Sequence, residues 1–265
     1  MSDNRPKRRI IESEGYEIEV LDWGEGPAVI LLPSLGRGAE DFNDLASRLA
    51  DAGYRSLCPH PRGIGGSSAP LDGLTMSDLA ADVKAVFDAF CDNPATLVGH
   101  AFGNRVARMT ATLYPESVDS VILLACGGLI QPSSEVSDAL RNVFDIEVSD
   151  EDHLEYVRRV FFAEGNDPSI WFDGWHGVVA YFQGQANGNE DVRRWWGAGS
   201  APIFIVQPSE DVIAVPQNSQ LILEEFGDRV VVEVIPNAGH ALLPEQPEAV
   251  AESVLGWLGK QRPSD

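Results

Sequence analysis

The stretch TLVGHAFGNRVARMTA, residues 96–111, decides the fold of this chain. Its apolar start predicts a buried strand that ends at Gly99. A turn framed by Gly99 and Gly103 follows, and the residues after it predict a helix over 104–115. Because glycine carries no Cβ, the strand can turn sharply into the helix, so that residue 101 projects from the turn.

The residue at the tip of this turn is Ala101. Strand–turn–helix connections of the form G-x-S-x-G place a nucleophilic serine at this position. A methyl group cannot attack a carbonyl carbon. The stretch therefore predicts where a site lies, but it does not predict a serine nucleophile.

Strand and helix patterns alternate on both sides of this stretch. Near-continuous apolar strands that alternate with helices predict an α/β fold with a mostly parallel sheet, covered by helices on both faces. The predicted strands are 16–24, 28–33, 54–59, 95–99, 118–126, 201–207 and 230–235, and the predicted helices are 39–53, 75–90, 104–115, 216–226 and 246–259.

One long segment interrupts the alternation. Residues 127–200 contain four of the six tryptophans and several acidic helical patterns. In open α/β sheets, ligands bind beyond the carboxyl ends of the strands. We therefore expect residues 127–200 to form a helical cap over that edge, and residues 1–126 and 201–265 to form the core.

Charge and composition exclude several classes of function. The net charge of −22 disfavours binding to nucleic acid, which requires a positive surface. No apolar run approaches 20 residues, so a membrane span is not expected. The basic cluster RPKRR (5–9) is expected to be a solvated tail. Three widely spaced cysteines fit a reducing cytoplasm rather than a disulfide framework.

Four further segments carry a family resemblance. They are LLPSLGRG (31–38), PHPRGIGGS (59–67), SEDVIAVP (209–216) and NAGHALLPEQPEAV (237–250). With GHAFG, in this order, they make the chain similar to the α/β-hydrolase fold family over nearly its whole length. The resemblance implies that the first segment is an oxyanion loop and that the last two carry a catalytic acid and a histidine.

The resemblance assigns roles to individual residues. His240 is the expected general base, and Asp211, rather than its neighbour Glu210, is expected to orient the His240 ring. The backbone N–H groups of Leu35 and Phe102 are the expected oxyanion hole, which does not depend on a serine.

Ala101 has a counterpart within this family. GHAFG resembles the GHALG of an aminoacrylate or carbamate hydrolase group, which implies that His240 and Asp211 activate water directly. The expected substrate is a small, fairly hydrophobic ester, lactone or carbamate. Trp171, Trp175 and Tyr181 of the cap are expected to line its pocket.

Other interpretations remain open at this stage. The chain could be a catalytically inactive ligand-binding or scaffold protein, a cofactor-free lyase, or an engineered Ser-to-Ala variant of a serine hydrolase. No metal-ligand cluster, phosphate loop or dinucleotide fingerprint is present, so no cofactor or metal is implied. The expected partner is a small-molecule substrate, and the choice between monomer and homodimer is open.

A few remaining residues have less specific expectations. Cys126 is expected to be a small buried hydrophobe rather than a substitute nucleophile. Arg193 and Arg194 are expected on the solvated surface. The other histidines, His60, His100, His153 and His176, are expected to have mainly structural roles.

Overall fold

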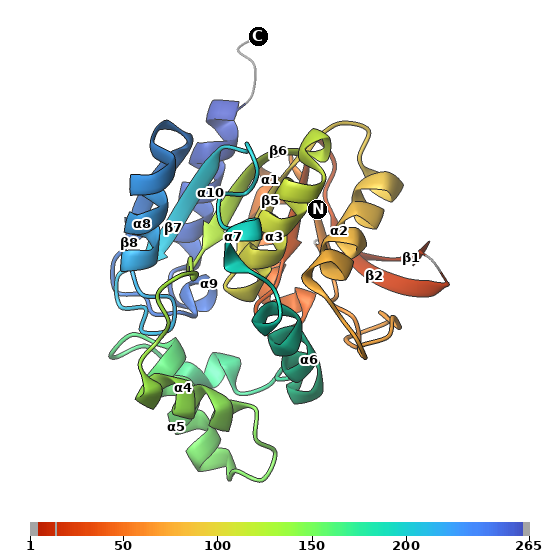
Figure 1. The fold of residues 1–265 in the computed structure, drawn as a ribbon. Coiled ribbons are helices and arrows are strands. Elements are labelled where there is room, and N and C mark those ends of the chain that lie inside the picture. The colour runs from red at the N-terminus through yellow and green to blue at the C-terminus, as the bar shows by residue number, and fades with distance from the viewer. Residues whose placement is uncertain (1–4, 14, 262–265) are drawn as a thin grey trace.

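The computed structural model describes residues 5–13 and 15–261 and contains a twisted sheet of eight strands within these ranges (Figure 1). The strand order is β1-β2-β4-β3-β5-β6-β7-β8, in which β2 runs antiparallel to its neighbours β1 and β4 and every other pair of neighbours is parallel. The strands are β1 (Lys7–Ser13), β2 (Tyr16–Trp23), β3 (Ala28–Leu32), β4 (Arg55–Pro59), β5 (Ala95–His100), β6 (Val118–Leu124), β7 (Ile203–Pro208) and β8 (Val230–Ile235). The predicted α/β class is confirmed.

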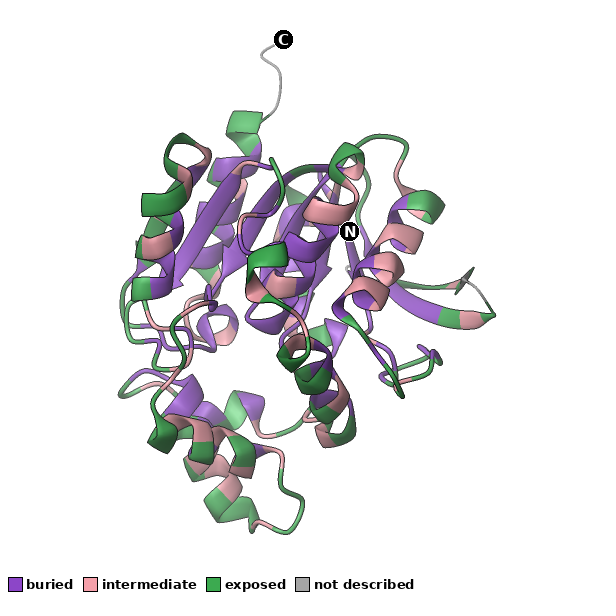
Figure 2. Ribbon diagram, viewed as in Figure 1, coloured by how far each residue is buried: buried purple, intermediate pink, exposed green. Residues whose placement is uncertain are grey.

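Helices cover both faces of the sheet, so that the inner strands β3, β4, β5, β6 and β7 are largely buried, whereas the edge strands β1 and β8 are partly exposed (Figure 2). Helices α2, α3 and α8 pack on one face and α1 and α10 on the other. The core helices are α1 (Asn43–Asp51), α2 (Met76–Phe90), α3 (Phe102–Leu113), α8 (Gln217–Phe226), α9 (Leu242–Glu245) and α10 (Pro247–Gln261), with 3-10 turns at Ala39–Phe42, Pro115–Ser117 and Gly227–Arg229.

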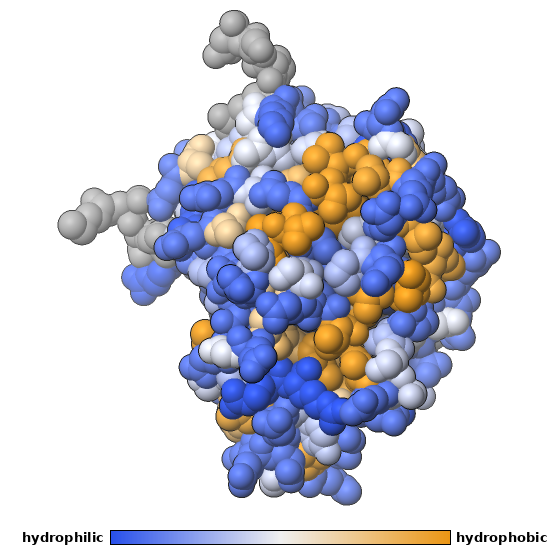
Figure 3. Space-filling view, turned by 90° about the vertical axis from the view of Figure 1, so that its left-hand side faces the viewer, coloured by the Kyte–Doolittle hydropathy of each residue, from blue (hydrophilic) through white to orange (hydrophobic). Residues whose placement is uncertain are grey.

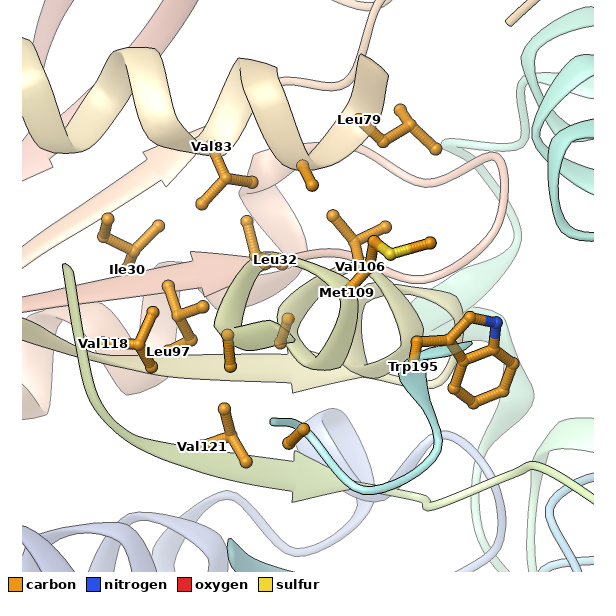
Figure 4. Close-up of a cluster of buried hydrophobic side chains, with 14 of the residues drawn as sticks. Ile30, Leu32, Leu79, Val83, Leu97, Val106, Met109, Val118, Val121 and Trp195 are labelled. Carbon is orange, nitrogen blue, oxygen red and sulfur yellow. The ribbon is translucent and has the colours of Figure 1, made fainter. Parts of the chain in front are cut away.

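The larger core cluster fixes α2 and α3 against the middle of the sheet. Figure 4 shows Val83 of α2 and Val106 of α3 lying over Ile30 and Leu97 of neighbouring strands. Each of these side chains is buried, and burying a branched aliphatic side chain stabilises a fold by about 1.5–3 kcal/mol. The start of α3, which follows Ala101, is therefore held in place by buried apolar contacts with α2, β3 and β5.

The N-terminal basic cluster corrects one prediction. Lys7–Ser13, expected to begin in a solvated tail, forms the edge strand β1. The Arg8 guanidinium lies 2.6 Å from the carboxylate of Glu19, and Arg9 lies 3.4 Å from that of Asp22, both on β2. The prediction failed because charges that suggest a tail are neutralised by the adjacent strand, and charged residues are typical of edge strands.

The segment between β6 and β7 is helical, as expected. It contains α4 (Ser134–Val143), α5 (Asp150–Phe161), a 3-10 turn (Pro168–Trp171), α6 (Gly177–Gly188) and α7 (Val192–Trp195). Helices α4 and α5 share their own apolar cluster, whereas Ala186 and Trp195 of α6 and α7 pack into the main core. The division into a core and a cap of residues 127–200 stays a prediction.

Polar side chains cover most of the face drawn in Figure 3, with separate hydrophobic patches between them. In the described part of the chain, no helix has both the length and the apolar composition needed to cross a bilayer.

Gly103 offers a steric test of the turn. A Cβ at Gly103 would lie 2.0 Å from the carbonyl oxygen of Leu32, so Gly103→Ala must displace α3 from β3. We expect it to lower the free energy of unfolding by about 3 kcal/mol, measured by urea denaturation. Gly256→Ala, on the exposed side of α10 with nothing near its Cβ, is the matched control and should raise stability by about 0.5–1 kcal/mol. Equal shifts for the two variants would contradict this packing.

Candidate active site

The turn between β5 and α3 holds Ala101 in a strained conformation. Its φ of 50° and ψ of −105° lie in a region that L-residues rarely adopt. The Ala101 N–H donates to the carbonyl of Leu124 on β6 at 2.9 Å. A Cβ at Gly99 would lie 2.4 Å from the backbone of Asn104, so the turn requires glycine at this position. The surrounding packing therefore imposes the geometry whatever side chain residue 101 carries.

His240 and Asp211 form a hydrogen-bonded pair beside this turn. The Nδ1 of His240 lies 2.9 and 3.0 Å from the two carboxylate oxygens of Asp211, and both side chains are buried. Asp211 is fixed in turn because its Oδ1 accepts the N–H groups of Ile213 and Ala214. Glu210, the alternative acid, is exposed. With Nδ1 bound to the carboxylate, Nε2 of His240 is the nitrogen available to a substrate or water.

His100 contacts His240 and helps to fix its position. Its Nε2–H donates to the backbone carbonyl of His240 at 2.7 Å, and its ring packs on Trp171 with centroids 5.8 Å apart. Burial, reinforced by the neighbouring His240, lowers the pKa of His100 to about 3. His100 is therefore neutral near pH 7 and does not repel a protonated His240. This agrees with the expected structural role.

A cavity of about 490 Å³ opens above Ala101. Ala101 and His240 lie in its wall together with Leu35 and Phe102, the two residues of the predicted oxyanion hole. The loop that carries Leu35 is held by α6, because the Gly36 N–H donates to the side-chain carbonyl of Gln183 on that helix at 2.8 Å. The predicted base and both predicted oxyanion donors thus belong to residues around one cavity.

The predicted pocket residues separate into two groups. Tyr181 of α6 lines the cavity, whereas Trp171 and Trp175 do not. Both tryptophan rings lie 4.4 Å from the Arg37 guanidinium, on which they pack, and Trp175 Nε1–H donates to the Trp171 carbonyl. The prediction failed for the two tryptophans because cation–π contacts hold them around a buried Arg37–Asp41 ion pair instead.

Sequence comparisons agree with this architecture. The sequence pattern of the alpha/beta hydrolase fold matches residues 27–146. The chain is 27% identical over 260 residues to the protein named "Putative carbamate hydrolase RutD" from Variovorax paradoxus (strain S110), which covers 91% of this chain and 95% of that protein.

Solved structures give the same result. The esterase EaEST from Exiguobacterium antarcticum matches with a TM-score of 0.82 at 20% identity, over 96% of this chain and 100% of that chain. E-2-(acetamidomethylene)succinate hydrolase matches with a TM-score of 0.80 at 20% identity, over 96% of this chain and 99% of that chain. The chain has the α/β-hydrolase fold.

In this α/β-hydrolase fold, the remaining candidates lie outside the catalytic arrangement. Cys126 is fully buried, and burial raises the pKa of its thiol, which disfavours the thiolate needed for attack. The pKa of His60 is lowered by burial, and its Nδ1 accepts the Ala39 N–H at 3.3 Å. Arg193 and Arg194 are exposed, as expected, and pair with the carboxylates of Glu225 and Glu190.

His153 and His176 also lie apart from the dyad. His153, on α5, bonds to the Phe172 carbonyl through Nε2 at 3.1 Å. His176 lines a second, separate cavity near Arg37. Neither lines the cavity above Ala101.

Among the lining residues that the sequence did not predict, one is charged and lies close to Ala101. Arg105 lies on the first turn of α3, four residues after Ala101. Residues four apart on a helix lie on the same side, so the spacing could have placed Arg105 at the site.

The buried His100 predicts a pH dependence of stability. Its pKa is about 3 in the folded chain and near 6.5 when unfolded. Between these values the unfolded chain binds a proton that the folded chain does not, so stability falls as the pH decreases below about 6.5. We expect His100→Gln to reduce the loss of unfolding free energy between about pH 7 and about pH 4.5 by roughly 2–3 kcal/mol.

Urea denaturation of the unaltered chain and of His100→Gln at several pH values in this range measures the free energy of unfolding of each. Because His60 is present in both, its own contribution cancels in the difference. An unchanged pH dependence in His100→Gln would mean that His100 is not neutral in the fold.

Proposed function

We propose that this chain is a hydrolase that cleaves a small, largely apolar ester, lactone or carbamate by direct attack of water. One observation carries the proposal. His240, paired with Asp211, faces the same cavity as the strained turn at Ala101 and the two predicted oxyanion donors. A base and an oxyanion hole are the parts of hydrolytic catalysis that do not require a serine.

The mechanism assigns one step to each group. The N–H groups of Leu35 and Phe102 bind the carbonyl oxygen of the substrate. A water molecule beside Ala101 attacks the carbonyl carbon while Nε2 of His240 takes its proton, and Asp211 stabilises the imidazolium. The tetrahedral intermediate then loses the leaving alcohol, whose oxygen receives the proton from His240, and a carboxylic acid remains from an ester or lactone or a carbamic acid from a carbamate.

The short side chain of Ala101 leaves room for this water. A serine Oγ at residue 101 would project from the turn toward the substrate carbonyl and become acylated. The alanine methyl lacks that oxygen, so a water can take the position of the missing nucleophile. General-base assistance of this kind contributes about 100- to 10,000-fold in rate, which suits an activated carbonyl compound.

The size and lining of the cavity support a small substrate. About 490 Å³ falls within the range of small-molecule sites. Apolar residues from the cap, including Leu140, Phe144 and Phe161, form much of the wall. The relative named for carbamate hydrolysis, similar over nearly the full length of both chains, supports including carbamates among the substrates.

A panel of p-nitrophenyl esters, lactones and carbamates tests the proposal. We expect slow turnover by the chain as it stands and a fall of about 100- to 10,000-fold in kcat for His240→Ala, because the base is lost. Asp211→Asn should lower kcat by a similar factor, because an asparagine no longer fixes the tautomer of His240. His153→Gln, remote from the cavity, is the control and should leave kcat unchanged.

Ala101→Ser completes the experiment. It should add a burst of acylation that the unaltered chain lacks. Turnover that survives His240→Ala would exclude the proposed mechanism. Activity found only after serine is restored would favour a disabled serine hydrolase, and absence of turnover from every variant would favour a ligand-binding protein.

A further inference from the structure

The guanidinium of Arg105 stands in the wall of the cavity without an anionic partner. Its side chain is half-buried, and its Nε is shielded from solvent with no hydrogen-bond partner. Within the described residues, no carboxylate lies within ion-pair distance of it. Burying an unpaired charge is costly, so such groups normally have a counter-ion.

A second buried arginine adds to the positive charge that lacks a counter-ion. Arg108 lies one turn further along α3 and bonds only to neutral oxygens, those of Asn104 and Gly127. Burial and the nearby Arg105 lower the pKa of Arg108 to about 10. Burial also lowers the pKa of Arg105, and only the Cys126 thiol opposes this effect. Arg105, which lines the cavity, therefore has a second buried cation behind it on α3, and neither forms an ion pair with a carboxylate of the described residues.

Packing against Trp195 accounts for the buried position of the Arg108 guanidinium but not for that of Arg105. The Arg108 guanidinium lies 4.5 Å from the ring centroid of Trp195, an ordinary cation–π contact. The Arg105 guanidinium lies 5.9 Å from the same ring, near the limit of such a contact. A structural role is thus evident for one arginine and weak for the other.

The charge of the cavity wall is opposite to that of the protein. The chain carries a net charge of −22, yet neither aspartate nor glutamate is among the described residues that line the cavity. Two arginines, Arg105 and Arg141, do line it. Arg141 is exposed and paired with Asp138, so its charge is already balanced. Arg105 is the unbalanced cation, and Gly127 beside it leaves space next to its Nη2.

We propose that Arg105 binds a carboxylate carried by the substrate. The inference rests on the proposed hydrolysis and narrows its substrate class to anionic esters, lactones or carbamates. Because Arg105 follows Ala101 by one helical turn, the carboxylate and the reacting carbonyl are joined by a spacer of a few atoms. The remainder of the substrate lies against the apolar wall.

Kinetics with a matched substrate pair test this assignment. Mono-p-nitrophenyl glutarate carries a carboxylate, and p-nitrophenyl pentanoate has the same chain length without one. We expect Arg105→Met to raise KM for the glutarate ester by about 10- to 100-fold, the range for a lost charged hydrogen bond, and to change KM for the pentanoate ester little. Arg105→Lys, which keeps the charge, should recover part of the loss.

Arg193→Met is the matched control. Arg193 pairs with Glu225 on the surface and does not line the cavity, so both KM values should stay as in the unaltered chain. Melting temperatures of all variants show whether a loss reflects unfolding. Equal effects of Arg105→Met on the two esters would overturn the proposal.

A binding measurement separates this inference from the proposed hydrolysis. The ketones 5-oxohexanoate and 5-oxohexanamide differ only in their terminal carboxylate or amide, and neither can be hydrolysed. Calorimetry on the unaltered chain and on His240→Ala should give binding of the carboxylate at least about tenfold tighter than that of the amide, with the preference lost in Arg105→Met.

Failure of the proposed hydrolysis and failure of the proposed Arg105 site therefore give different results. Selective carboxylate binding without turnover of any ester would reject the hydrolytic mechanism and keep the Arg105 site. Turnover of esters without any preference for the carboxylate would reject the Arg105 site and keep the hydrolysis.

Discussion

The strained backbone of Ala101 is the constraint on which the site depends. A positive φ at a residue other than glycine costs about 1–3 kcal/mol and persists only where the surrounding structure enforces it. Here β5, α3 and β6 enforce it through the Ala101–Leu124 hydrogen bond and the close contact of Gly103 with β3. The same turn sets the position of Phe102, whose N–H is a predicted oxyanion donor. The missing serine therefore removes one atom of the site and leaves its architecture in place.

The sequence predicted the parts of the site that depend on local patterns. Glycine spacing located the turn, and the loops after the last two strands located Asp211 and His240, which the structure brings into contact. Trp171 and Trp175 were misplaced because their positions depend on Arg37, a residue far away in the chain. Composition indicates an aromatic cluster, but it cannot tell whether the rings face a ligand or a buried cation.

The edge strand and Arg105 were missed for a related physical reason. Both involve charged side chains whose surroundings are set by tertiary contacts. The arginines of β1 meet carboxylates on β2, so a cluster that suggests a solvated tail is neutralised within a sheet. Within residues 5–13 and 15–261, Arg105 forms no ion pair with a carboxylate. In a protein of net charge −22, Arg105 lies in a cavity whose described lining contains neither aspartate nor glutamate, and the carboxylate-binding role proposed for it depends on this local difference in charge.

Intact-mass spectrometry during turnover tests the central claim most directly. The unaltered chain is mixed with an excess of mono-p-nitrophenyl glutarate, and samples are quenched in acid at intervals. The mass of the intact protein is measured in each sample, and the release of p-nitrophenol is followed in parallel. Direct attack of water predicts that product accumulates linearly, without a burst, while the protein keeps its unmodified mass. A glutaryl adduct that forms and decays at the rate of turnover would contradict the account, because a side chain of the protein would then be the nucleophile.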